Sequence, residues 1–223
     1  MRISAWSAVA SLLATVAAAN DAAGQSIANR VNSVRDGTVQ MQFASRPGVC
    51  GDGNGSVWFQ GNDRGYNSGR YVCVVGPIRV TIGRADGETV SIRKCVGCRP
   101  RAVSSEIVDL GDVPPADAAK YLLGVAVGTA ARNADEAVGA AALADAGDLS
   151  GDFSRLVQNK DATLETRKQA VFWLSQSDGD AVPKLIDIAR NDSDIRVRKD
   201  ALFWLGQTHD PRAVKFFHDV LSP

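Results

Sequence analysis

The feature that most constrains the fold is an internal repeat in the C-terminal part of the chain. The segment RKQAVFWLSQ, Arg167 to Gln176, recurs as RKDALFWLGQ, Arg198 to Gln207, at an offset of 31 residues. Each copy is followed by a short polar turn and then by a second segment with helical spacing. A repeat of helix, turn and helix predicts a short right-handed α-solenoid, because each hairpin can bury its apolar face only against its neighbours.

The repeated helices contain a predicted core. In each copy three apolar residues fall at positions i, i+3 and i+4 and therefore share one face of the helix. We expect these residues to be the repeat core: Ala170, Trp173, Leu174, Ala201, Trp204 and Leu205. An earlier and more degenerate unit fits residues 134–157, and residues 116–131 are expected to form a helix before it.

Two arginines begin the equivalent helices, Arg167 and Arg198. We expect them to meet acidic residues of neighbouring turns, such as Asp161, Asp192 or Asp194. Such pairs would form a ladder that fixes the stacking of the repeats rather than a ligand site.

Three phenylalanines are candidates for a partner surface: Phe172, Phe203 and Phe216. Because the repeated helices are apolar over most of their circumference, burial between stacked hairpins is the simpler expectation for Phe172 and Phe203. The alternative is an exposed aromatic strip that binds a partner peptide. That alternative requires Phe203 or Phe216 to be open to solvent.

The last two units also carry a recognisable pattern: DIRVR at 194–198, then Ala201, Leu205 and Gly206, then DPRAV at 210–214. This pattern resembles the short bacterial HEAT repeat, of the kind also seen in phycobilisome-lyase-like proteins. The resemblance covers roughly residues 134–221 and is weaker in the first unit. It implies a scaffold for protein contacts, although the fold alone does not fix the task of one member.

Residues 25–114 have a different pattern, rich in glycine and with alternating apolar and polar residues. The clearest element is a hairpin whose strands, 78–82 and 90–92, flank an Ala-Asp-Gly turn. Further strands are expected after Thr38 and at 71–75. We therefore predict a small antiparallel β domain with arginines on its solvent face, followed by a helical repeat domain over residues 115–223. The whole chain is then of the α+β class.

All four cysteines, Cys50, Cys73, Cys95 and Cys98, fall in the predicted β domain. Four cysteines allow three pairings, and the sequence alone leaves the connectivity open. We favour Cys50 with Cys73 and Cys95 with Cys98, because the second pair is already local and the first closes a glycine-dense loop. In the chain-entropy model the first bridge contributes about 3.4 kcal/mol and the second about 1.9 kcal/mol.

Functional interpretations of the β domain are weaker than this structural one. The Cys-Val-Gly-Cys spacing permits thiol–disulfide exchange, but such a motif needs a helix N-terminus, and here a strand precedes it. A four-thiolate zinc site needs two close cysteine pairs, and only one is present. Asp52, Asn54, Ser56 and Asp63 partly match a calcium loop, but its central glycine, final glutamate and flanking helices are missing. We predict no metal site and no cofactor.

The first segment of the chain has the order of a secretory signal peptide over residues 1–19. Arg2 precedes an Ala-rich apolar run that ends in small residues at Ala17 and Ala19, and cleavage as late as Gly24 is also compatible. No other segment is long and apolar enough to span a bilayer. We expect the mature chain to be secreted or periplasmic, in an oxidising compartment that permits disulfides.

Composition disfavours several classes of function. The 25 basic and 25 acidic residues give zero formal charge, which argues against nucleic-acid binding. There are only two histidines, His209 and His218, and the sequence has no phosphate-binding glycine motif and no nucleophile elbow.

We therefore expect a non-catalytic scaffold that binds another protein or an envelope component. One alternative is a thiol–disulfide oxidoreductase that uses Cys95 and Cys98. Another, by resemblance alone, is a chromophore-lyase-like protein. In a third, the β domain merely caps the solenoid.

Overall fold

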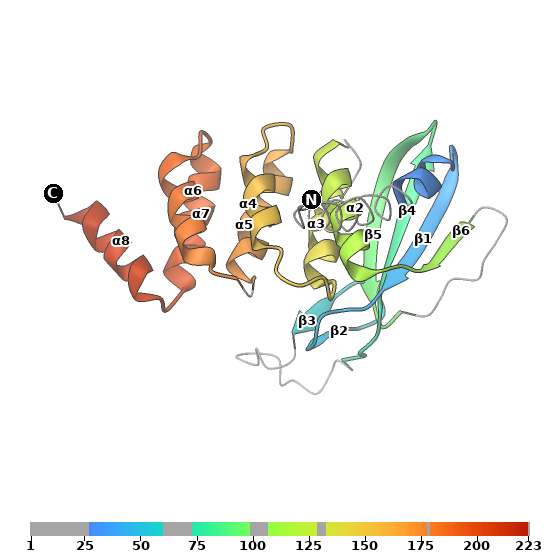
Figure 1. The fold of residues 1–223 in the computed structure, drawn as a ribbon, viewed down its shortest axis with the longest axis horizontal. Helices are drawn as coiled ribbons and strands as arrows, with labels where there is room; N and C mark the ends of the chain where they lie inside the picture. The colour runs from blue at the N-terminus through green and yellow to red at the C-terminus, as the bar shows by residue number, and fades with distance from the viewer. Residues whose placement is uncertain (1–26, 60–72, 99–106, 129–132, 178, 223) are drawn as a thin grey trace, which may run out of the picture.

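The described part of the chain comprises a β-sheet from its N-terminal residues and a row of helices from its C-terminal residues (Figure 1). The computed structural model describes residues 27–59, 73–98, 107–128, 133–177 and 179–222. The mixed α+β class predicted from the sequence is confirmed. The predicted signal peptide lies outside the described residues.

The main sheet has four strands in the order β5-β4-β1-β6. Their bounds are Gly37–Phe43 for β1, Ile78–Ala85 for β4, Glu88–Val96 for β5 and Ile107–Asp112 for β6. The alternation that predicts the hairpin is clearest in β4, where every second residue is buried, beginning with Ile78, Val80 and Ile82. This buried face packs toward the helices, so the polar residues between point to the other side of the sheet.

The expectation of a purely antiparallel sheet is wrong. β1 pairs antiparallel with β4 and β4 with β5, but β6 pairs parallel with β1. Strands β5 and β6 occupy opposite edges of the sheet and run in the same direction. Alternation along a strand indicates which residues share a face, and it contains no information about strand direction.

Two smaller features also differ from the predictions. At the end of β4 the pairing with β5 shifts register, which leaves Val90 out of the ladder and 45% exposed, although its alternation with Ile92 predicted burial. The strand expected at 71–75 is reduced, in its described part, to a single bridge between Val74 and Gly51. Gly51 belongs to a small hairpin of β2, Val49–Gly51, and β3, Val57–Phe59.

The cysteines lie in the two pairs favoured from the sequence. Cys50 lies at disulfide distance from Cys73, with Cα atoms 5.3 Å apart, and Cys95 from Cys98, with Cα atoms 6.0 Å apart. Both separations fall within the range of protein disulfides. The first pair joins β2 to the chain just before β4, and the second links the end of β5 to the turn that follows it.

The helices follow one another in a row that leads away from the sheet (Figure 1). Their bounds are α2 Pro115–Gly128, α3 Ala134–Leu143, α4 Ser150–Gln158, α5 Leu164–Ser175, α6 Ala181–Asn191, α7 Ile195–Gln207 and α8 Pro211–Leu221. The repeated segments form α5 and α7, and the segments after the polar turns form α6 and α8. No described helix is long and apolar enough to cross a membrane.

The pairing of these helices differs from the predicted hairpins. The repeat predicted that α5 packs most closely with α6, and α7 with α8. In the structure the closest packing is between α2 and α3, between α4 and α5, and between α6 and α7 (Figure 1). Helices α5 and α7 also lie side by side, as do α3 and α5. A repeat defines a period but not its starting point, so sequence similarity cannot decide which of two flanking helices packs more closely.

The sheet and the first helices share one hydrophobic core. The apolar face of the sheet, together with α2 and α3, belongs to the same buried cluster as the later helices. Backbone hydrogen bonds also cross the predicted boundary, from the N–H of Arg46 to the carbonyl of Leu143 and from the N–H of Asp145 to the carbonyl of Ala44. The sheet therefore packs directly on the helical row, with β5 against α3.

Candidate functional site

Four aromatic rings form a continuous series across α5 and α7, which we call the aromatic strip: Trp173, Phe172, Trp204 and Phe203. The ring centroids of Trp173 and Phe172 are 4.8 Å apart, those of Phe172 and Trp204 4.9 Å, and those of Trp204 and Phe203 5.0 Å. The rings meet at tilted or edge-on angles, the arrangement that aromatic side chains prefer. The strip arises because the repeated Phe-Trp pair occurs on two helices that lie side by side.

Exposure rises along the aromatic strip from one end to the other. Trp173 is 8% exposed, Phe172 and Trp204 are partly buried, and Phe203 is 57% exposed. The expectation that Phe203 is buried between hairpins is therefore wrong. The alternative, an exposed aromatic strip, requires Phe203 or Phe216 to be open to solvent, and Phe203 meets this requirement. An exposed phenylalanine supported by a layer of partly buried rings is typical of a contact surface rather than a fully packed core.

Phe216, the third candidate for a partner surface, does not belong to the strip. Its side chain is 4% exposed, and the guanidinium of Arg190 on α6 lies 5.1 Å from its ring centroid. Phe216 lies on the apolar face of the amphipathic α8, and this face packs against α6. Phe216 is therefore buried, although α8 follows a polar turn like the one that precedes α6.

The residues predicted as the repeat core are mostly buried. Ala170, Leu174, Ala201 and Leu205 are fully buried, and Trp173 is nearly so. Trp204 is the exception, because its ring lies between Phe172 and the exposed Phe203. Trp173 and Trp204 occupy equivalent positions in the repeat, but only Trp173 is covered over most of its ring.

Lys168, Glu165 and Asp200 lie on the two helices of the aromatic strip and pair with one another. The ammonium of Lys168 on α5 lies 3.7 Å from the carboxylate of Asp200 on α7 and 3.8 Å from that of Glu165. These pairs are partly or largely exposed, so each contributes little to stability. The ammonium and the two carboxylates together carry a net charge of only −1, which suits an uncharged apolar group.

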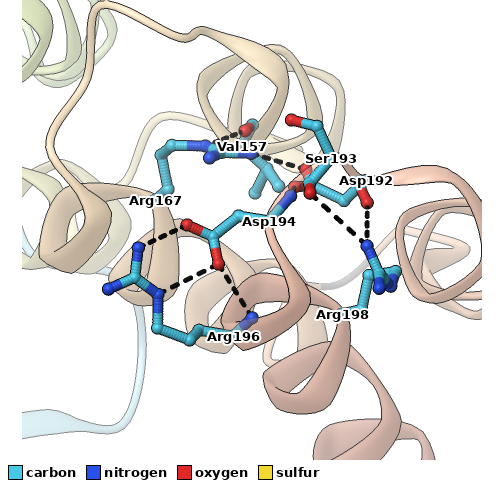
Figure 2. Close-up of polar contacts among 7 residues, drawn as sticks. All are labelled: Val157, Arg167, Asp192, Ser193, Asp194, Arg196 and Arg198. Atoms are coloured by element: carbon cyan, nitrogen blue, oxygen red, sulfur yellow. Dashed lines mark hydrogen bonds and ion pairs between the residues drawn. The ribbon is translucent and has the colours of Figure 1, made fainter.

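Arg167 forms the buried part of the predicted ladder (Figure 2). Its Nη2 donates to Oδ2 of Asp192 at 2.5 Å, and its Nε donates to the carbonyl of Val157 at 2.6 Å. The side chains of Arg167 and Asp192 are only 9% and 5% exposed. This pair joins the end of α4, the start of α5 and the end of α6, which is the stacking role expected from the sequence.

Arg198 behaves differently from its counterpart (Figure 2). Its Nη1 donates to the carbonyl of Asp192 at 2.7 Å and lies 3.5 Å from the carbonyl of Ser193. Within the described residues no carboxylate forms an ion pair with it. Asp192 is the C-cap residue of α6, and the C-cap residue of α8 is Ser222, which has no carboxylate.

Asp194 caps α7 instead of pairing with Arg198 (Figure 2). Its Oδ1 accepts from the backbone N–H of Arg196 at 2.8 Å, and its carboxylate also binds the guanidinium of the same residue. The hydrogen bonds from the side chain of Arg196 and from its backbone N–H hold the pKa of Asp194 well below its ordinary value.

The same Asp-x-Arg cap recurs at α8, and our sequence interpretation missed it. Asp210 accepts from the backbone N–H of Arg212 at 2.8 Å, and the side chain of Arg212 holds its pKa down at about 2. Arg212 also reaches Asp180 at the start of α6, with Nη1 2.7 Å from Oδ2. The signal was present as DIR and DPR at 194–196 and 210–212.

The outer face of the sheet carries a second feature, an open cavity of about 570 Å³ that we call the basic hollow. The residues that matter for its chemistry are Gln40, Arg79, Thr81, Arg93, Cys95 and Cys98. Arg79 and Arg93 lie on the solvent face of the hairpin, as predicted for its arginines, whereas Arg84 is only 8% exposed. The Cys95–Cys98 pair lines the same hollow.

The remaining sequence candidates have no special environment. His209 and His218 are exposed. Oδ1 of Asp52 accepts the backbone N–H groups of Asn54 and Ser56, so it closes a turn; Asp63 lies outside the described residues. No group of three or more potential metal ligands is found in the part of the chain that the structure describes.

Comparisons of the chain with protein-family models, with curated proteins and with solved structures find no match.

Proposed function

We propose that this chain is an exported, non-catalytic scaffold built on HEAT-like repeats, and that it binds a partner protein through the aromatic strip. Three points support the proposal: the signal-like segment 1–19, the repeated units and the exposure of Phe203. The exposure of Phe203 carries most weight, because an aromatic side chain that is supported by other rings and open to solvent is typical of binding hot spots.

The chemistry of the strip defines the partner segment. Lys168 partly compensates Asp200 and Glu165, so the strip offers aromatic surface without a strong field. Such a surface favours an uncharged apolar anchor, for example a leucine, methionine or phenylalanine on an exported protein. A partner anchored by a charged residue would lose hydration without gaining an opposite charge.

The substitution Phe203→Ala tests this function. We expect it to weaken partner binding about 10-fold or more, the usual effect at a hot spot, while leaving the circular dichroism spectrum unchanged. The mature chain is used as bait in an envelope extract, and the captured protein is then purified and its affinity for each variant is measured.

The matched control is Val214→Ala, which removes an apolar side chain that is 66% exposed on α8, outside the strip. The proposal requires Val214→Ala to bind like the unaltered chain. Equal binding by Phe203→Ala and the unaltered chain would contradict it.

One observation favours a second candidate, a thiol–disulfide oxidoreductase. The Cys95–Cys98 pair lines the open hollow, and Nη1 of Arg79 lies 3.9 Å from Sγ of Cys98. A guanidinium near a thiol favours the thiolate, which is the reactive form.

An insulin-reduction assay separates the two functions. The scaffold proposal expects no turnover above background, because Cys95 lies in strand β5 without a helix N-terminus to activate it. Turnover that disappears in Cys95→Ser but persists in Cys50→Ser/Cys73→Ser would establish the oxidoreductase instead.

A further inference from the structure

The basic hollow brings two arginines of neighbouring strands to one face of the sheet. In the pairing of β4 with β5, Arg79 lies opposite Cys95 and Thr81 lies opposite Arg93. Arg79 and Arg93 are therefore diagonal neighbours, with the hydroxyl of Thr81 next to both along the ladder. The Cα atoms of diagonal neighbours are about 7–8 Å apart, so both guanidinium groups can reach one ligand.

Neither of these two arginines forms an ion pair with a carboxylate within the described residues. Arg79 donates to the amide oxygen of Gln42 at 2.5 Å and to the carbonyl of Cys98 at 2.7 Å, both of which are neutral groups. Arg93 is exposed and forms no ion pair with a described carboxylate. Like charges so placed repel each other, so the arrangement is stabilised when an anion lies between them.

Asp52 on the opposite wall does not supply that anion. Its Oδ1 accepts hydrogen bonds from the backbone N–H groups of Asn54 and Ser56, at 2.7 Å and 3.1 Å, within its own turn. The hydrogen bond from the N–H of Asn54 is the main cause of its lowered pKa. Because Asp52 accepts from its own turn and forms no ion pair with Arg79 or Arg93 in the described part of the chain, the guanidinium groups remain available.

Gln40 provides an independent indication of a ligand. It lines the hollow on the central strand β1, opposite Thr81, and it is 3% exposed. Its Nε2 donates to Asp109 at 2.7 Å, so the amide orientation is fixed, and its Oε1 has no hydrogen-bond partner among the described residues. A buried acceptor without a donor is costly, and an N–H group of a ligand would satisfy it.

We propose that the basic hollow binds a small organic anion, whose carboxylate or phosphate group is held by Arg79 and Arg93 and whose N–H group is accepted by Gln40. A volume of about 570 Å³ is in the range of small-molecule sites. Guanidinium groups bind both kinds of oxyanion in a bidentate manner, so the shared chemistry is the oxyanion. This site is separate from the aromatic strip and does not depend on its function.

Titration calorimetry on the full mature chain tests the proposal with three probes: N-acetylglycine, inorganic phosphate and the neutral N-acetylglycinamide. We expect at least one of the two anions to bind and the neutral amide not to bind. Tighter binding of N-acetylglycine identifies a carboxylate ligand, and tighter binding of phosphate identifies a phosphate ester. Affinity should fall with added salt, because screening weakens exposed charge pairs.

Arg93→Gln is the primary variant, because Arg93 holds no other described group in place, whereas Arg79 also supports the carbonyl of Cys98. We expect Arg93→Gln to weaken anion binding about 10-fold or more, and the control Arg155→Gln, at a 73%-exposed side chain on α4, to leave it unchanged. Absence of binding by both anions, equal binding of the neutral amide, or equal losses in both variants would overturn the proposal. Phe203→Ala should keep full anion affinity, so failure here is distinct from failure of the scaffold function.

Discussion

Truncation of Trp173 to alanine is expected to lower the free energy of unfolding by about 3–5 kcal/mol. The indole is 8% exposed and contacts the ring of Phe172, with fully buried Ala170 and Leu174 on the same face of α5. Removing it would leave a cavity where α5 faces α3, and a domain has roughly 5–15 kcal/mol to lose. Urea unfolding followed by circular dichroism measures the change.

Phe203→Ala is the matched control, since it truncates an aromatic residue of the same strip that is 57% exposed. It should cost about 1 kcal/mol or less, because little of its surface leaves water on folding. Trp204→Ala is expected to fall between the two. If Trp173→Ala and Phe203→Ala proved equally mild, the assignment of Trp173 to the core would be wrong.

The second large effect is expected at the buried ion pair of Arg167 and Asp192. Replacing Asp192 with asparagine should cost about 3–5 kcal/mol, because the guanidinium of Arg167 would then remain buried without an opposite charge. The double variant Arg167→Met/Asp192→Leu should cost much less than Asp192→Asn, since no uncompensated charge is left.

The exposed pair of Arg155 and Asp152 provides the control, with side chains that are 73% and 41% exposed. Asp152→Asn should change stability by about 0–1 kcal/mol in the same urea experiment. A similar value for Asp192→Asn would mean that the buried pair does not hold α4, α5 and α6 together.

Much of the local structure was accessible from the sequence. The apolar spacing of α5 and α7 placed Ala170, Leu174, Ala201 and Leu205 in the core, and all four are buried. The cysteine spacing favoured the two pairs that lie at disulfide distance. These features are local, or follow from the entropy of closing a single loop, so they require no knowledge of distant neighbours.

The candidate site was accessible only in part. The sequence offered Phe172, Phe203 and Phe216 as candidates but favoured burial of the first two. The structure leaves Phe203 open and buries Phe216 against α6. The basic hollow was not anticipated at all, although the alternation of Arg79, Thr81 and Arg93 on the polar face contained its residues. The strands and turns that surround a polar face decide whether it forms a hollow, and the sequence does not show which strands and turns these are.

By itself the amino-acid sequence determined the helical period, the faces of the repeated helices and the hairpin, because each follows from the geometry of a short stretch of chain; it favoured the pairs of cysteines without deciding them. Only the tertiary structure decided the parallel direction of β6, the closer packing of α6 with α7, and the difference in exposure between Trp173 and Phe203. These outcomes depend on which element covers which face, and that is fixed by burial of apolar surface across the whole core rather than by neighbours along the chain.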